Sequence, residues 1–395
     1  MNILYVSRYA VYDGVPHAGG NTVLYYMKSM AMNSRNDVRM VSFITEEEFG
    51  KVNLREYNIT YYPIPWKKSV LGMVKSINSK INPFHHYCNM TASYHIEELI
   101  EKIKDISNNY LPDIVVVEWT QLVLAVDKIK QVFPNAKYIA SEHDVTFLAV
   151  ERKFLRENNL IKKMYKYLIY LNTKRRELAT LNLFDKIITH NEKDKQILIE
   201  NGIPSKSIMP IVAYYHQTAE FYHRTDNHIV YYGALSRKEN IDSVIWFLEN
   251  VLPKLNDIDV QFYVVGGGLT KELKTYESDR VIFTGYVDSI DNIFSSAMCF
   301  VAPLVLGAGI KVKVLEAMYT GITVITNDIG IEGIPAVKNR DYYHCENAAE
   351  YANTIRKIYH SEIPMLNANA FVTDSFDIRV SLKKYVELMD TLYIE

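Results

Sequence analysis

The sequence has 395 residues, of which 48% are hydrophobic and 23% are charged, and its formal net charge is -2. This length favours two domains, and so small a charge argues against a general nucleic-acid-binding protein. Its three cysteines, Cys88, Cys299 and Cys345, have the spacing of neither a disulfide framework nor a zinc site, which is typical of a reducing compartment. The N-terminus predicts a strand and not a signal peptide, and no apolar run approaches the roughly 18 residues that span a bilayer. We therefore expect a cytoplasmic protein.

Short apolar runs alternate with longer helical patterns along the whole chain. Strands are predicted at 2–7, 38–44, 113–119, 137–141, 185–189, 228–232, 259–265, 280–284, 297–302 and 322–326. Helices are predicted at 20–32, 91–107, 151–181, 192–201, 241–252, 287–296, 310–320, 346–360 and 376–393. This alternation predicts an α/β protein with parallel sheets and helices on both of their faces.

The strand and helix pattern restarts near residue 228, after a loose and polar stretch of chain. We therefore predict a Rossmann-like domain at 1–215, a second one at 216–375, and a terminal helix at 376–395 that packs back on the first. Ligands of such sheets bind outside the carboxyl ends of the strands, so motifs at strand ends are expected to line a cleft between facing domains.

The most informative stretch is 301–334, where a strand, a loop with two glycines, a helix and a strand follow one another. Lys311 and Lys313 are expected in the first turn of the helix, with Glu316 about one turn further on. A helix N-terminus offers free N–H groups and a positive dipole end, so it binds anions, and the lysines add charge. Since cations in this turn oppose the dipole, their presence indicates a function. The stretch predicts a nucleotide-diphosphate site, although Lys313 and Glu316 would also suit a simple i,i+3 pair.

A glycine pair follows the first strand of the first domain. Gly19 and Gly20 allow a ligand to approach the backbone, and Asn21 or Thr22 is expected to cap the helix that follows. An ordinary strand-to-helix loop is the alternative interpretation. The spacing is not that of a dinucleotide-binding fingerprint, because no G-x-G-x-x-G is present.

A histidine follows the predicted strand at 137–141 in the same domain. His143 can hydrogen-bond a substrate hydroxyl or a phosphate, and Asp144 is expected to orient its ring. A His-Asp pair in a loop is otherwise structural, and both interpretations stay open at this point.

Two further motifs follow strands of the second domain. Arg237 and Lys238 lie just before a helix that is expected to begin near residue 241, and both side chains can bind phosphate. The alternative is a solvated pair of cations. Gly266 opens a run of three glycines that permits close approach of a base or sugar, or simply forms a flexible turn.

Two stretches are rich in lysine and arginine, at 66–81 and 152–177. Apolar residues at helical spacing accompany the basic ones in the first stretch. An amphipathic basic helix can lie on an anionic membrane surface, so peripheral membrane contact is one hypothesis. A solvated helix face is the alternative.

With these residues in view, the chain resembles a GT-B-fold glycosyltransferase, and it is most similar to glycosyltransferase family 4, the group 1 glycosyl transferases. The resemblance covers the second domain and is thin in the first. It is carried by 302–304, 309–318, 321–324, 230–240, 246–247, 264–266 and 284–287, and in the first domain by 19–20, 143–144 and 191–194.

The resemblance implies two Rossmann-like domains that face each other across a cleft, the first binding the acceptor and the second the nucleotide sugar. It implies retaining transfer of a sugar from a nucleotide-diphosphate donor to a glycan or lipid-linked acceptor in bacterial surface-polysaccharide or glycoconjugate synthesis. No metal and no cofactor are expected. The partners are then the nucleotide sugar and the acceptor, with no nucleic acid, and the location is the cytoplasm or the inner membrane face.

By the same resemblance, each motif residue has an expected role. Glu316 would hold the ribose hydroxyls, and His143 would contact the donor sugar. Arg237 or Lys238, with Lys311 or Lys313, would neutralise the diphosphate. The remaining donor-site residues are Gly266, Gly309 and Ile310, and the phosphate or acceptor loop is Gly19, Gly20 and Asn21.

The sequence departs from the family pattern at one position. Many members carry an acid eight residues before the helix glutamate, and here that position is Ala308. A non-catalytic GT-B subunit that binds a nucleotide sugar or a partner glycosyltransferase would explain this loss. A nucleotide-sugar epimerase is a further alternative, and it would convert the donor without any acceptor.

Overall fold

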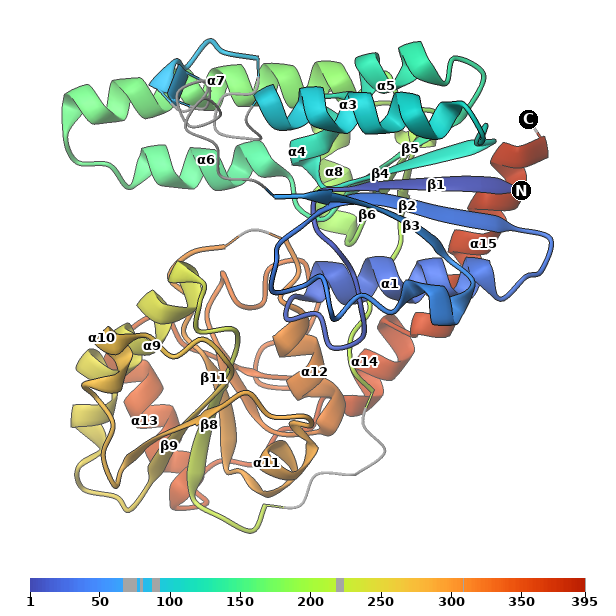
Figure 1. The fold of residues 1–395 in the computed structure, drawn as a ribbon. Helices are drawn as coiled ribbons and strands as arrows, with labels where there is room; N and C mark the ends of the chain where they lie inside the picture. The colour runs from blue at the N-terminus through green and yellow to red at the C-terminus, as the bar shows by residue number, and fades with distance from the viewer. Residues whose placement is uncertain (67–76, 79–80, 87–92, 218–223, 308, 395) are drawn as a thin grey trace. The chain divides into compact units, whose positions relative to one another are not determined.

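The structure is a computed structural model that describes residues 1–66, 77–78, 81–86, 93–217, 224–307 and 309–394. The chain divides into two compact units (Figure 1). Unit 1 comprises Met1–Tyr214 and Arg379–Glu395, and unit 2 comprises Tyr215–Ile378. Among the described residues, no helix combines the length and the apolar character that a membrane crossing requires.

Unit 1 is built on a seven-stranded parallel sheet with the order β3-β2-β1-β4-β5-β6-β7. Its strands are β1 Asn2–Ser7, β2 Asp37–Ile44, β3 Thr60–Pro65, β4 Ile114–Glu118, β5 Lys137–Glu142, β6 Lys186–Thr189 and β7 Ile208–Pro210. Its helices are α1 Ala18–Ala31, α3 Ser93–Ser107, α4 Thr120–Val123, α5 Val126–Val132, α6 Thr146–Leu155, α7 Leu160–Leu181, α8 Glu192–Glu200 and α15 Ile378–Ile394, with short 3-10 turns at Leu54–Tyr57 and Ser205–Ser207.

Each face of this sheet carries its own hydrophobic core, because side chains alternate along a strand. Leu4 and Val6 of β1 point into a core with α3, α5 and α8, whereas Ile3 and Tyr5 point into a core with α1 and α15. Figure 1 shows these two helix layers on either side of the sheet. Helix α15 is fixed there by Tyr385, whose hydroxyl lies 2.7 Å from that of Tyr5.

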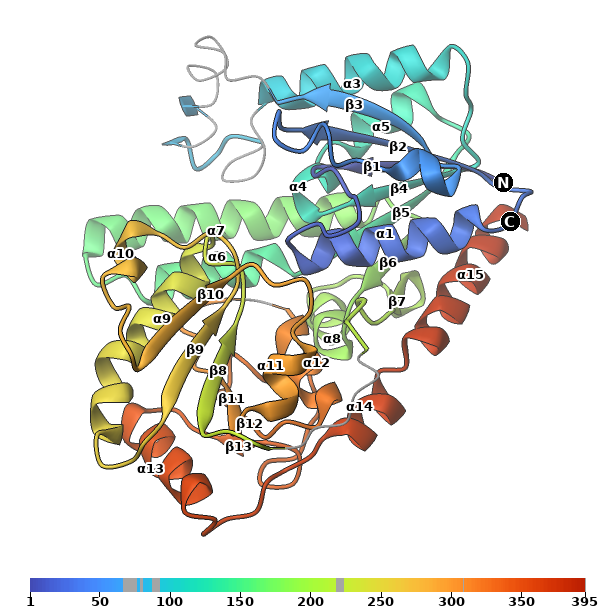
Figure 2. The same ribbon diagram turned by 60° about the horizontal axis from the view of Figure 1, so that its bottom comes forward.

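Unit 2 is built on a six-stranded parallel sheet with the order β10-β9-β8-β11-β12-β13. Its strands are β8 His228–Tyr232, β9 Gln261–Val265, β10 Val281–Gly285, β11 Cys299–Ala302, β12 Val324–Thr326 and β13 Tyr343–His344. Its helices are α9 Lys238–Asn250, α10 Lys271–Lys274, α11 Asp291–Ser296, α12 Val312–Thr320, α13 Ala348–Tyr359 and α14 Asn369–Ser375, with a 3-10 turn at Leu252–Leu255. Helices α9 and α13 cover one face of the sheet, and α11, α12 and α14 cover the other (Figure 2).

The predicted α/β architecture with parallel sheets is confirmed, and three strands are missing from the prediction. These are β3, β7 and β13, which pair with only one neighbour and end their sheets. Prolines in β3 and β7 suit such edge positions, since proline lacks the N–H that a central strand must donate. The same prolines hide the strands from pattern analysis.

The single helix predicted at 151–181 is wrong, because the chain forms two helices, α6 and α7, separated near Asn159. The Asn159 side chain accepts hydrogen bonds at 3.1 Å from the backbone N–H groups of both Ile161 and Lys162. This is an N-cap, which satisfies donors that a helix start leaves free. A new helix therefore begins within a stretch that is uniformly helical in pattern.

Candidate active site

The strand-end loops of unit 2 meet at the carboxyl edge of its sheet. Gly266 follows β9 with a φ of 146°, and a Cβ atom on it would lie 2.0 Å from the carbonyl oxygen of Gly233, which follows β8. Glycine is therefore required at position 266 for two neighbouring loops to pack backbone against backbone. A contact of Gly266 with a ligand stays a prediction.

Lys313 lies at the start of α12 and reaches the end of β8. Its Nζ atom donates hydrogen bonds to the Tyr231 hydroxyl and to Oδ1 of Asn240, both at 2.9 Å. The amine lies 3.2 Å from the place that a Cβ on Gly233 would take. Burial, with nearby cations, lowers the pKa of Lys313 to about 7. Its hydrogen bonds therefore fix the amine at the sheet edge, instead of the i,i+3 pair with Glu316.

Lys311 is enclosed by the glycine loop that precedes α12. Its backbone forms the N-cap of the helix, one residue before the predicted first turn, and its side chain does not cap the helix. The Nζ atom donates to the Gly309 carbonyl and lies 3.7 Å from Oε2 of Glu332. The amine is thus held against the loop that precedes α12.

Arg237 and Lys238 lie at the surface. Helix α9 begins at Lys238, earlier than predicted, and Arg237 forms its N-cap. The Arg237 side chain is 60% exposed and lies 3.4 Å from Glu239, and that of Lys238 is 82% exposed and lies 2.8 Å from Asp242. The structure therefore separates the four predicted cations into two enclosed lysines and two solvated side chains.

Glu316 lies one turn after Lys313 on α12. Its Oε1 atom accepts a hydrogen bond from the backbone N–H of His216 at 3.2 Å. Burial raises the pKa of Glu316 to about 7. The carboxyl group is partly buried and keeps acceptor positions beyond the one that His216 uses, as a group that binds hydroxyls requires. Ala308 lies outside the described residues.

The carboxyl edge of the unit 1 sheet is different in composition. His143 follows β5, and its Nε2 atom lies 3.0 Å from Oε2 of Glu118 at the end of β4. The Trp119 ring stacks on the His143 ring, with centroids 4.6 Å apart and an interplanar angle of 16°. The prediction that Asp144 orients this ring is therefore wrong: Glu118 of a neighbouring strand supplies the carboxylate, and Oδ1 of Asp144 accepts from the Thr146 hydroxyl at 3.4 Å.

Gly19 faces the same histidine from α1. A Cβ atom on Gly19 would lie 3.2 Å from Nδ1 of His143 and 3.2 Å from the Trp119 ring. The predicted helix cap at Asn21 or Thr22 is wrong. Helix α1 begins earlier, with His17 as its N-cap, and Nδ1 of His17 accepts from the Gly20 N–H at 2.9 Å. The helix predicted at 20–32 thus begins two residues earlier, at Ala18.

Three more buried titratable side chains surround this edge, and sequence analysis missed all of them. Glu142 is 1% exposed, burial raises its pKa to about 8, and its Oε1 atom has no hydrogen-bond partner among the described residues. Burial also raises the pKa of Glu177, which accepts from two backbone N–H groups at 2.9 and 3.0 Å. His190 donates from Nδ1 to the Ile211 carbonyl at 2.8 Å, while its buried Nε2 finds no partner in the described part of the chain.

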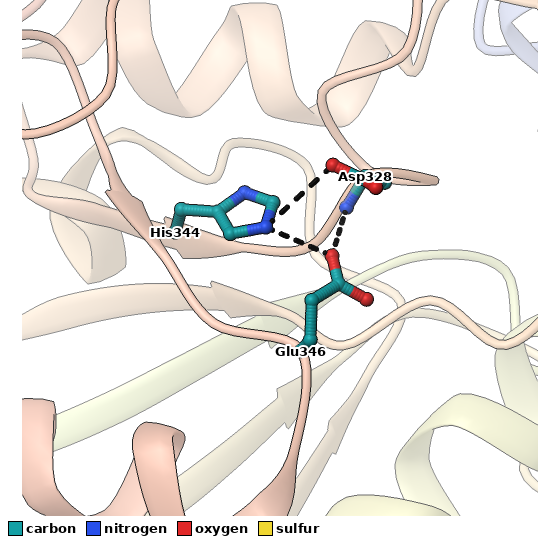
Figure 3. Close-up of side chains that lie close together, drawn as sticks. All are labelled: Asp328, His344 and Glu346. Carbon is teal, nitrogen blue, oxygen red and sulfur yellow. Dashed lines mark hydrogen bonds and ion pairs between the residues drawn. The ribbon is translucent and has the colours of Figure 1, made fainter.

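One group of side chains in unit 2 has the composition of a metal site. Asp328 follows β12, while His344 ends β13 and Glu346 follows it, and their ligand atoms lie within 4.8 Å of one another (Figure 3). Nε2 of His344 lies 3.0 Å from Glu346 and 3.6 Å from Asp328, whose backbone N–H also donates to Glu346 at 2.7 Å. These contacts account for the cluster without an ion, and Asp328 is 83% exposed. The expectation that the protein needs no metal stays a prediction.

The two basic stretches differ in how much of them can be described. Most of 66–81 lies outside the described residues. The stretch 152–177 falls on α6 and α7, where large apolar side chains are exposed beside the basic ones. These include Leu155, Leu160, Ile161, Met164 and Leu171.

The comparisons with known proteins bear first on unit 2. Residues 226–361 match the model of the family Glycosyl transferases group 1. This part of the chain contains β8, β9, β11, the glycine loop and α12. Residues 226–361 therefore resemble a group 1 glycosyl transferase domain. The resemblance predicted from the sequence is thereby confirmed.

Two solved structures show the fold of the whole chain. Sucrose-phosphate synthase from Thermosynechococcus elongatus has a TM-score of 0.72 at 14% identity, over 100% of this chain and 99% of its own. HepE of Anabaena, solved in complex with UDP-glucose, has a TM-score of 0.68 at 14% identity, over 99% of this chain and 100% of its own. The protein has the GT-B fold, as predicted.

One curated relative is similar over part of its length. An uncharacterized 44.6 kDa protein in the cps region of Klebsiella pneumoniae is 25% identical over 244 residues, which are 56% of this chain. The match covers 60% of that relative.

Proposed function

We propose that the protein transfers a sugar from a nucleotide-diphosphate donor to a glycan or lipid-linked acceptor, with retention of the anomeric configuration. The observation that carries this proposal is the group on α12 of the group 1 domain. Two enclosed lysines, Lys311 and Lys313, lie at the helix N-terminus, and Glu316 follows one turn later. Cation, amide and carboxylate together match the diphosphate and ribose of one donor molecule.

The rate enhancement then comes from stabilising the leaving group. A departing nucleoside diphosphate develops negative charge, and donors held in place before the reaction stabilise it without reorganisation. Lys313 is held by Tyr231 and Asn240, and Lys311 by the loop around Gly309. Arg237 and Lys238 are solvated, so we propose that they contribute less to stabilising the leaving diphosphate. Because the lysines supply the neutralising charge, we propose that transfer requires no metal.

In unit 1 we propose that His143 contacts the donor sugar and that Gly19, Gly20 and Asn21 approach the donor phosphate or the acceptor. The geometry supports a contact there, because Gly19 leaves room beside Nδ1 of His143. Burial lowers the pKa of His143 to about 4, so the ring is neutral at pH 7 and can exchange hydrogen bonds with hydroxyl groups.

The cellular role is proposed from the relatives. HepE was solved with UDP-glucose, so UDP-sugars are the first donors to test. The Klebsiella relative is a protein of the cps region, which supports a role in bacterial polysaccharide synthesis. We place the protein in the cytoplasm, where nucleotide sugars are made.

The direct test is a transfer assay. The protein is incubated with UDP-sugars and oligosaccharide or lipid-linked acceptors, and both nucleoside diphosphate and the product anomer are followed by NMR. We expect diphosphate release that depends on an acceptor and a product with the anomeric configuration of the donor. A donor converted without acceptor would indicate the epimerase, and an inverted product would contradict retention.

Peripheral membrane contact through 152–177 is a further part of the proposal. Leu160 and Ile161 are each 82% exposed at the start of α7 and are followed by two lysines. Apolar side chains ringed by cations suit the surface of an anionic bilayer. Flotation with anionic liposomes at low salt should carry the protein upward, and Leu160→Ser with Ile161→Ser should reduce it. Equal flotation with neutral liposomes would contradict an electrostatic contribution to membrane binding.

A further inference from the structure

Glu118 is the last residue of β4 and is only 4% exposed. A buried carboxylate is costly unless it is hydrogen-bonded, and one of its oxygens lies 3.0 Å from Nε2 of His143. Strand β4 pairs with β5 so that Glu118 lies opposite Ser141, two residues before the histidine. The pairing of two central strands therefore sets the distance between the carboxylate and the ring.

Burial raises the pKa of Glu118 to about 7, so above about pH 7, where the carboxyl is ionised, the contact decides which nitrogen of the ring carries the proton. An ionised carboxylate is an acceptor only, so Nε2 must be the protonated nitrogen when Glu118 accepts from it. In a neutral ring the second nitrogen, Nδ1, then presents a lone pair. This is the nitrogen that faces Gly19, at 3.2 Å from the position of a Cβ atom.

Aromatic rings fix the plane of His143 from two sides. Trp119 stacks on it at 4.6 Å, and the His190 ring lies 4.7 Å away at an angle of 44°. Trp119 has backbone angles of φ 68° and ψ 132°, which are unfavourable for a bulky side chain. Such strain persists where the surroundings enforce it, and it clusters at functional sites. The strained residue is the one that follows Glu118.

We propose that Glu118 is a positioning residue which, together with the Trp119 ring, holds His143 so that its Nδ1 accepts a hydrogen bond from a hydroxyl group of the sugar substrate. This inference rests on the proposed function, in which His143 contacts the sugar. It adds Glu118, which lies outside residues 226–361, and it states that the sugar hydroxyl donates and Nδ1 of His143 accepts. It also gives Gly19 a role, because any side chain there would occupy the approach to Nδ1.

A double-mutant cycle tests whether Glu118 acts through His143. Glu118→Ala removes the acceptor and should lower kcat about tenfold or more, as expected for a lost hydrogen bond to a charged group. Glu118→Gln keeps an oxygen that can accept from Nε2 and should restore most of this loss. In a His143→Ala background, Glu118→Ala should cost nothing more. A full additional loss in that background would show that Glu118 acts independently, and would overturn the proposal.

NMR of the histidine ring tests the same point without turnover. In protein labelled with ¹⁵N-histidine, long-range ¹H–¹⁵N spectra recorded at about pH 8, where Glu118 is mostly ionised, should show His143 protonated at Nε2 in the wild type and in Glu118→Gln. In Glu118→Ala the ring should lose this fixed state. Protonation at Nδ1 in the wild type would overturn the inference, whether or not any donor reacts. If no donor reacts while the ring behaves as expected, the proposed function fails and the positioning role stands. Should Glu118→Ala not fold, the wild type and Glu118→Gln still decide.

Discussion

The carboxyl edges of the two sheets are built from different chemistry. In unit 2 the edge carries two enclosed lysines and one carboxyl group on the first turns of α12. In unit 1 it carries buried carboxyl groups and neutral histidines, at the ends of β4, β5 and β6. Lysine amines suit a diphosphate, whose negative charge favours their protonated form, whereas neutral groups that donate and accept suit sugar hydroxyls. The two sheets thus share an architecture but differ in the side chains at their carboxyl edges.

The largest effect is expected from the enclosed lysines. Lys313→Met keeps the apolar stem but removes the ammonium that contacts Tyr231 and Asn240. We expect kcat/KM for the donor to fall about 100-fold or more, because a preorganised charge is lost where charge develops. Lys238→Ala is the matched control, since its side chain is 82% exposed, and it should change kcat/KM less than about threefold. An equal loss of kcat/KM in the two variants would contradict the distinction between enclosed and solvated cations.

The next largest effect is expected at Glu316, the residue proposed to bind the ribose. Glu316→Gln keeps the size of the side chain and the acceptor for the His216 N–H. It should weaken donor binding about tenfold while the melting temperature changes little, because it weakens hydrogen bonds to the ribose. Isothermal titration with the nucleoside diphosphate measures this. A variant that binds as tightly as the wild type would remove Glu316 from the site.

The acidic edge of unit 1 should make stability depend on pH. Burial raises the pKa of Glu142 to about 8 in the folded state, so the folded protein retains a proton that the unfolded chain has lost. A raised carboxyl pKa favours the fold at low pH, and this stability is lost as the pH rises towards 8. Between pH 6.5 and 8 we expect the wild type to lose about 1–2 kcal/mol relative to Glu142→Gln in urea unfolding. The histidines titrate alike in the two proteins, so the difference between the two curves isolates Glu142. Parallel curves for the two proteins would contradict a raised pKa.

The smallest effect is expected at Asp328, His344 and Glu346. Their contacts with one another account for the cluster, so His344→Ala and EDTA should each change transfer less than about twofold. The assay is the transfer reaction with and without chelator. A loss with EDTA that added Mn²⁺ or Mg²⁺ restores, and that His344→Ala reproduces, would show a required metal at this cluster.

Features formed by residues that are close together in the chain could be predicted from the sequence, whereas features formed by distant residues could not. The alternation of buried strands and helices fixes the central strands of both sheets, whose residues are almost wholly buried. The edge strands β3 and β7 contain prolines and resist the same analysis. The residues proposed to bind the donor, Lys311, Lys313 and Glu316, lie within a short run of the chain, so sequence analysis can identify them as one motif.

The pair of Glu118 and His143 could not be found in that way. The two residues are 25 positions apart and meet only because β4 pairs with β5. Asp144 is adjacent to His143 in the chain, but its side chain accepts from Thr146, and the carboxylate at the ring comes from the next strand. A buried carboxyl at the end of an apolar strand, such as Glu118 in β4, is the signal that could have pointed to it.

The central claim is that the enclosed lysines on α12 bind a nucleoside diphosphate. The measurement that tests it most directly is a thermal-shift panel with UDP, GDP, ADP and dTDP, each with and without EDTA. A ligand at 100 times its dissociation constant adds about 2.7 kcal/mol of apparent stability, which raises the melting temperature clearly. We predict a shift with one nucleotide that EDTA does not change, that Lys311→Ala and Lys313→Met abolish, and that Lys238→Ala retains. A shift that survives the loss of both enclosed lysines would contradict the account.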